Sequence, residues 1–118
     1  MEIREFYEAI GGNYNDVFSR LMKDERILKY LGKFLEDNNL ELMDKNLAEN
    51  NYEEAFKNVH TLKGIVLNLG LEPISKTSKI LCEEIRYGEP KNDISQMNKD
   101  LHEAYDLVTN KIKELINE

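Results

Sequence analysis

The chain has 118 residues, of which 41% are hydrophobic and 33% charged, with a formal net charge of −7, and this length predicts one globular domain over residues 1–118. Because an acidic surface repels phosphates, the charge argues against nucleic acid and anionic membranes as partners. The single cysteine and the lack of an apolar run of about 18 residues predict a cytoplasmic protein without a disulfide or a membrane span.

Two short helices are predicted within about residues 1–22, ahead of the main bundle. Gly11-Gly12 ends the first helix, whose apolar face is formed by Ile3, Phe6, Tyr7 and Ile10. Asn13 fits the N-cap of the second helix, because its side chain can accept a hydrogen bond from a free backbone N–H. The apolar face of that helix is formed by Tyr14, Val17, Phe18 and Leu21.

Two further apolar stripes precede a long central helix. The first ends near Asp37 and is formed by Ile27, Leu31, Phe34 and Leu35, and the second is formed by Leu40, Met43 and Leu47. Asn38-Asn39 lies between them and is either a break or only a kink; the pattern does not decide which. The central helix is predicted over about residues 52–69, and Gly70 suits the left-handed conformation that ends many helices.

Two more helices complete the pattern. Pro73 fits the first position of the next helix, which Gly88-Glu89-Pro90 stops. Asp93 followed by Gln96 is typical of a capping box at the start of the last helix. The apolar residues of that helix recur every three or four positions: Ile94, Met97, Leu101, Ala104, Val108, Ile112 and Leu115. The sequence therefore predicts an all-α fold, an antiparallel four-helix bundle over about residues 25–117 with one or two short additional N-terminal helices.

The central helix carries the candidate site. Each residue advances about 100° around an α-helix, which places His60 opposite the apolar arc formed by Ala55, Val59, Leu62, Val66 and Leu69. Around His60 lie Phe56, Lys57, Lys63, Gly64 and Leu67. A mid-helix glycine costs about 1 kcal/mol relative to alanine, so Gly64 indicates that another molecule approaches the imidazole. Exposed apolar neighbours are typical of a contact surface.

An exposed imidazole in this setting can act as a nucleophile. The pKa of a free histidine is about 6.5, so the neutral ring is available near pH 7 and can hold a phosphoryl group through a P–N bond. Lys63, one turn away, can balance the added charge, and Lys57 can contribute to the local positive field. The competing interpretation is structural: most helix histidines are ordinary surface residues, and Phe56 and Leu67 would be core if this helix were buried on all sides.

The stretch His60-Thr61-Leu62-Lys63-Gly64, followed by Leu69-Gly70, resembles the signature of the histidine-containing phosphotransfer (HPt) family. Leu81 and Arg86-Tyr87-Gly88 resemble the stretch that follows the next helix in that family. Upstream, Phe34-Leu35-Glu36 and residues 47–52 resemble its preceding helices and turn. The resemblance covers residues 25 to 115, almost the entire chain.

The resemblance implies a four-helix bundle in which His60 is phosphorylated, Lys63 stabilises the phosphate and Gly64 leaves room for the partner. That partner would be the receiver domain of a response regulator, a hybrid histidine kinase, or both. The receiver would supply the acceptor aspartate and its bound Mg²⁺, because phosphoryl transfer needs positioning and charge stabilisation above all. This chain itself would need no cofactor or metal, and it contains no phosphate-binding glycine loop. It is expected to be a monomer.

Three positions depart from the family pattern. Small residues usually follow the Lys-Gly pair, but here Ile65, Val66 and Leu67 do, and Leu67 would be an apolar contact for the receiver. Cys82 occupies a position where Glu or Gln is common, within reach of the histidine; the alternative is an ordinary buried cysteine. Phe56 is larger than the residue in many relatives. Partner contacts are therefore expected from Phe56, Lys57, Leu67 and Cys82.

Two alternatives to a phosphorelay carrier stay open. The bulky run over residues 65–67 would suit a docking module that binds receiver domains without being phosphorylated. The chain would instead be the phosphoacceptor domain of a chemotaxis-type histidine kinase if a kinase, rather than a receiver, phosphorylated it. His102, the only other histidine, lies off the apolar stripe of the last helix and is expected to be solvated.

Overall fold

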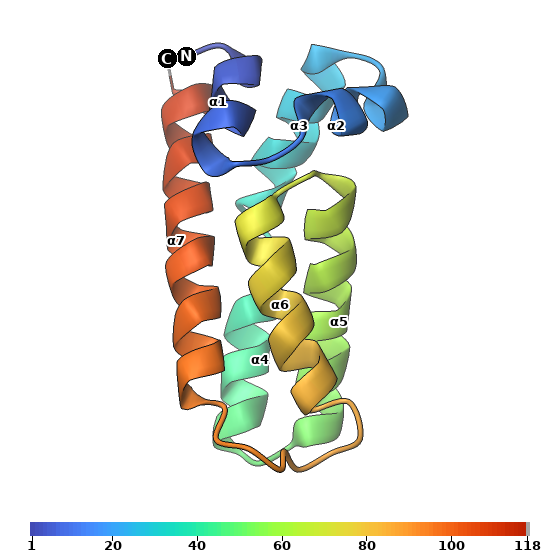
Figure 1. Cartoon of the computed structure of the whole chain (residues 1–118), viewed down its shortest axis with the longest axis vertical. Helices are drawn as coiled ribbons and strands as arrows, with labels where there is room; N and C mark the ends of the chain where they lie inside the picture. Colours follow the sequence, from blue (N-terminus) through green and yellow to red (C-terminus); the bar gives the residue numbers. More distant parts are fainter. Residues whose placement is uncertain (118) are drawn as a thin grey trace.

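The computed structural model describes residues 1–117, which form seven α-helices joined by short loops (Figure 1). No strand occurs in this part of the chain, so the prediction of an all-α fold is confirmed. The helices are α1 (Ile3–Ile10), α2 (Tyr14–Leu21), α3 (Asp24–Phe34), α4 (Asn39–Ala48), α5 (Tyr52–Asn68), α6 (Glu72–Glu84) and α7 (Ser95–Ile116).

The helices α4 to α7 form an antiparallel bundle. They lie side by side and alternate in direction, and α7 runs along the whole length of the molecule (Figure 1). Above α4, α3 continues along the same edge and packs against the upper part of α7. α1 packs against α7, and α2 packs against α1 and α3, so the two short helices close one end of the bundle.

The connection between α3 and α4 is a break in the helix. α3 ends at Phe34, and helical structure resumes only at Asn39. The carboxylate of Asp37 accepts hydrogen bonds from the backbone N–H of Asn39 at 3.1 Å and from its side-chain amide at 2.8 Å. A side chain that satisfies the backbone in this way competes with the helix. The hydrophobic pattern left open whether Asn38-Asn39 is a break or only a kink, and these hydrogen bonds favour the break.

The N-terminal helices are held against the α5–α6 connection by close contacts. The Tyr7 hydroxyl, which is buried, donates a hydrogen bond of 2.8 Å to the Leu69 carbonyl. Gly70 has a φ of 65°, and a Cβ at this position would clash with the Val17 side chain. A glycine at position 70 is therefore required both by the backbone conformation and by the packing of α2.

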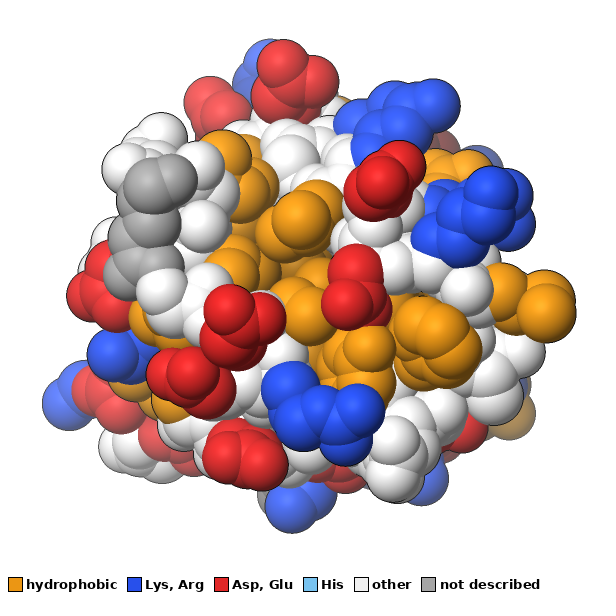
Figure 2. Space-filling model, turned by 90° about the horizontal axis from the view of Figure 1, so that it is seen from above, with side chains coloured by type: hydrophobic (Ala, Val, Ile, Leu, Met, Phe, Trp, Pro, Cys, Tyr) orange, Lys and Arg blue, Asp and Glu red, His pale blue; other side chains and the backbone are white. Residues whose placement is uncertain are grey.

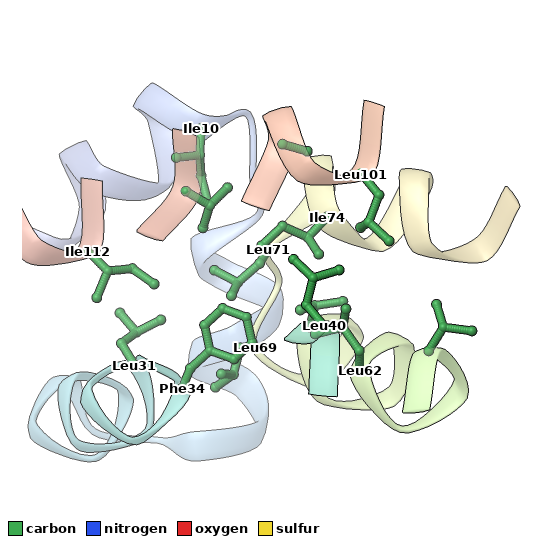
Figure 3. Packing of buried hydrophobic residues seen from close by; sticks show 14 of the residues in the cluster. Ile10, Leu31, Phe34, Leu40, Leu62, Leu69, Leu71, Ile74, Leu101 and Ile112 are labelled. Carbon is green, nitrogen blue, oxygen red and sulfur yellow. The ribbon is translucent and has the colours of Figure 1, made fainter. Parts of the chain in front are cut away.

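One continuous hydrophobic cluster contains buried side chains from all seven helices. Figure 3 shows how residues far apart in the sequence meet in it, among them Ile10, Leu31, Leu71 and Ile112. No helix within residues 1–117 is both long enough and apolar enough to cross a membrane. Burial of apolar surface at about 25 cal/mol per Å² is the main force that holds the helices together.

Two predicted helix starts need correction. Pro73 is the second residue of α6, after Glu72, rather than the first. Asp93 accepts a hydrogen bond from the Ser95 N–H at 2.9 Å and not from Gln96, whose side chain bonds to Asp100 instead. The predicted capping box is therefore wrong, because the chain enters α7 through a tighter turn in which the carboxylate reaches only two residues ahead.

The end of the molecule that carries both termini is partly apolar. Figure 2 shows apolar side chains gathered over this end, with charged side chains around them. The exposed large apolar side chains of α2, the residue that follows it, α3 and the last turn of α7 are Phe18, Met22, Tyr30 and Ile116.

Candidate functional site

The ends of α5 fix the position of the candidate site. At its start, the Asn51 side chain accepts a hydrogen bond from the Glu54 N–H at 3.3 Å, and Glu53 and Glu54 lie in the first turn, where the helix dipole favours negative charge. At its end, the Leu71 N–H donates to the Val66 carbonyl at 2.9 Å while Gly70 adopts the left-handed conformation. The helix between these caps presents its two faces in a fixed orientation.

The two faces of α5 are clearly different. One face is fully buried and consists of Ala55, Val59, Leu62 and Val66. On the opposite face the His60 side chain is exposed. Among residues 1–117, no side chain or backbone group forms a hydrogen bond or an ion pair with its imidazole. We call this surface the histidine face and define it by Phe56, Lys57, His60, Lys63, Gly64 and Leu67.

Aromatic contacts flank the imidazole on one side. The ring centroids of Phe56 and His60 are 5.4 Å apart, with an angle of 40° between the ring planes. The Arg86 guanidinium lies over the Phe56 ring, 5.9 Å from its centroid, and forms an ion pair of 2.8 Å with Glu83. Phe56 is thus half-buried between His60 and α6 rather than freely exposed, and Arg86 joins the site although the helix pattern alone did not indicate it.

The two lysines of the histidine face differ in their availability. The Lys57 ammonium forms an ion pair with Glu54 at 3.1 Å, and the hydrogen bond and charge of that carboxylate raise the pKa of the lysine. Lys63 is partly exposed and has no ion-pair partner within the described chain. Lys63 is therefore the cation that remains free to pair with a new anion near His60.

Gly64 leaves the surface beside His60 open. A Cβ built on this residue would have no atom within 4 Å outside its own helix, so the fold does not require a glycine here. One turn further, 61% of the Leu67 side chain is exposed. The imidazole is thus bordered by bare backbone and then by an apolar side chain, an arrangement that a second protein can approach closely.

A comparison with family models identifies the chain. Residues 29–117 match the model described as the Hpt domain, and this match covers well over half of the chain. The chain belongs to the Hpt-domain family. Hpt domains take part in histidine phosphotransfer in two-component phosphorelays and generally interact with the receivers of response regulators. Neither the comparison with curated proteins nor that with solved structures gave a match.

Within this Hpt domain, Cys82 is not on the surface, where the sequence analysis expected it to contact the partner. Its side chain is fully buried between the helices, so it cannot touch a docked partner, and the expectation of a partner contact is wrong. Burial raises the pKa of the thiol, and the positive charges of Lys63 and Arg86 oppose this effect. Cys82 is therefore a buried residue of α6 whose thiol stays in the neutral, unreactive form.

The His102 side chain is 39% exposed, in agreement with its expected solvation, but it also has a partner that was not expected. Its Nε2 lies 2.8 Å from Oδ2 of Asp44, so it connects α7 to α4. Asn98 donates to the other oxygen of the same carboxylate at 3.3 Å. Within residues 1–117, His60 is then the histidine of this Hpt domain that has no hydrogen-bond or ion-pair partner. The same part of the chain contains no group of three or more His, Cys, Asp or Glu residues that could hold a metal ion.

Proposed function

We propose that the chain is a phosphorelay carrier that accepts a phosphoryl group on His60 and exchanges it with the aspartate of a receiver domain. In the forward step, the unprotonated ring nitrogen attacks phosphorus, the P–O bond to the receiver aspartate breaks, and the electron pair leaves with the carboxylate. The reverse step restores the acyl phosphate and the neutral imidazole. The hybrid kinase or response regulator that carries the receiver would be the partner.

A single observation supports this proposal most strongly. Within residues 1–117, an exposed imidazole without a hydrogen-bond or ion-pair partner lies one turn from a lysine without an ion pair and beside an open stretch of backbone. A structural histidine is usually held by a hydrogen bond or an ion pair, as His102 is held by Asp44. Lys63 would neutralise part of the charge on the phosphoryl group, and Gly64 would let the receiver aspartate come within reach.

The proposal assigns the remaining chemistry to the partner. Phosphoryl transfer is catalysed by positioning and by charge stabilisation, and a receiver would provide both through its aspartate and bound Mg²⁺. The Hpt domain would contribute the nucleophile, one cation and a docking surface, and would need no nucleotide or metal of its own. We expect it to do this as a monomer within the cytoplasm.

A docking module without phosphotransfer is the second candidate, and the exposed Leu67 favours it. The rest of the bulky run does not, because Val66 is fully buried and Ile65 packs against the core. Only one of the three large side chains therefore reaches the histidine face. Leu67 lies beyond Gly64 and leaves the approach to the imidazole open.

Incubation with phosphorylated receiver domains separates these functions. The carrier predicts label on the protein that is labile in acid and stable in base, and that is absent from His60→Gln. His102→Gln is the matched control, since it removes the other histidine and should leave the label unchanged. Binding without label would support the docking module. Label that appears only with ATP and a separate histidine kinase would instead support a chemotaxis-type phosphoacceptor domain.

A further inference from the structure

A groove runs beside the histidine face, between the C-terminal half of α5 and the N-terminal half of α6. It has a volume of about 400 Å³ and is lined by Lys63, Leu67, Glu72, Ser75, Lys76 and Lys79. We call it the lysine groove. Two of its residues, Lys63 and Leu67, also belong to the histidine face, so a partner that covers His60 extends naturally into the groove.

The lysine groove contains more positive than negative charge, and ion pairs do not neutralise it within residues 1–117. None of its three lysines forms an ion pair inside residues 1–117, whereas Lys57 and Lys111 pair with neighbouring glutamates on their own helices. Glu72 is the one acidic residue that lines the groove. A local excess of positive charge therefore borders the phosphorylation site in a chain whose net charge is −7.

The lysine groove combines one apolar side chain with cationic ones. Leu67 of α5 is 61% exposed, and Lys76 and Lys79 are exposed on α6. An ammonium group on a flexible stem can turn toward a carboxylate at little cost, while the leucine offers contact area to an apolar side chain. This combination fits a surface that carries both an apolar residue and carboxylates.

We propose that the lysine groove binds an acidic segment beside the acceptor aspartate of the receiver domain, and so selects among receivers by their charge. The inference rests on the proposed function, because the receiver must dock on the histidine face. An apolar side chain of that segment would cover Leu67, and its carboxylates would pair with Lys76 and Lys79. Lys63, one turn from His60, would remain for the phosphoryl group.

Such a groove would affect the rate at which the partner associates and the choice between partners. Opposite charges across an interface speed diffusional association and reject partners of the same sign, while adding less to the final affinity. The net charge of −7 sharpens the effect, because it disfavours non-specific contact with an acidic receiver elsewhere on the surface. A receiver with a basic margin around its aspartate would be repelled at the groove itself.

The test uses receiver domains purified from the regulators of the same genome, grouped by the charge of the surface around their acceptor aspartate. The full chain and the variant Lys76→Glu/Lys79→Glu are compared for binding and for phosphotransfer. The control variant Lys29→Glu/Lys113→Glu makes the same change in net charge at exposed lysines of α3 and α7 that do not line the groove. His60 is first labelled with phosphoramidate, and rates are expressed per labelled histidine.

Acidic receivers should lose about tenfold or more in association rate with the groove variant at low salt, and far less with the control. Replacing the acidic residues of the most affected receiver with lysine should restore binding to the variant. Equal losses in both variants, or no loss, would overturn the assignment of the groove. Absence of label on His60 after incubation with phosphorylated receivers would instead refute the carrier function, and the binding measurements would still decide the role of the groove.

Discussion

Replacing Gly64 should change stability and phosphotransfer in opposite directions. A Cβ at this position meets no atom within 4 Å outside its own helix, so Gly64→Ala introduces no clash. The change removes the helix penalty of glycine and should raise the free energy of unfolding by about 1 kcal/mol. For a domain of this size that corresponds to an increase in Tm of about 4 °C. Gly64→Leu should raise the free energy of unfolding similarly, because leucine is also a good helix former.

The same two substitutions should impair docking of the receiver, and the larger side chain should impair it more. The leucine side chain would stand beside His60 at the point where the receiver must approach. Because a displacement of about 1 Å can cost about 100-fold in rate, we expect Gly64→Leu to slow phosphotransfer by about that factor and Gly64→Ala by less. Thermal unfolding and transfer of label from a phosphorylated receiver measure the two effects.

Gly32 provides the matched control. It lies in α3, away from the histidine face, and a Cβ there would make an ordinary contact with Ile116 at 3.8 Å. Gly32→Ala should therefore stabilise the protein in the same way and leave transfer unchanged. The reasoning fails if Gly64→Ala destabilises the fold, or if Gly64→Leu transfers at the normal rate.

Three further predictions concern other residues. Lys63→Ala should shorten the lifetime of the phosphohistidine, measured by loss of label, and Lys57→Ala should do so less because Glu54 already engages its charge; equal effects would contradict this. Tyr7→Phe should lower the free energy of unfolding by about 1–3 kcal/mol in urea titrations, since it strands a buried carbonyl; an unchanged midpoint would argue against it. Cys82 should react with iodoacetamide at pH 8 only after unfolding, because burial raises its pKa and hides the thiol; rapid labelling of the native protein would refute this.

Several helix ends, and the two faces of α5, could be predicted because they depend on local chemistry. Gly11 and Gly70 adopt the left-handed conformation at helix ends, and Asn13 caps α2 through the Asp16 N–H. The 3.6-residue period of the helix places His60 opposite Leu62 and the rest of the buried face without any knowledge of the fold. The break before α4 was not predictable from this period, because it depends on where one carboxylate finds its donors.

Contacts between helices could not be predicted in the same way. Periodicity gives the angle of a side chain about its own helix, but it does not give the breadth of the face that neighbours cover. α6 lies between α5 and α7, so its buried arc is wide enough to include Cys82 as well as Leu81. For the same reason the contact of Arg86 with Phe56 and the pairing of His102 with Asp44 required the three-dimensional arrangement.

The histidine face contains the features of α5 that do not benefit the isolated protein. Gly64 weakens the helix, Leu67 keeps most of its apolar surface in water, and Lys63 has no ion-pair partner among residues 1–117. We expect these costs to be offset when a second molecule covers the face and brings an anion. The opposite face of the same helix is apolar and fully buried. Local departures from the rules of stability therefore coincide with the surface where we expect the partner to bind.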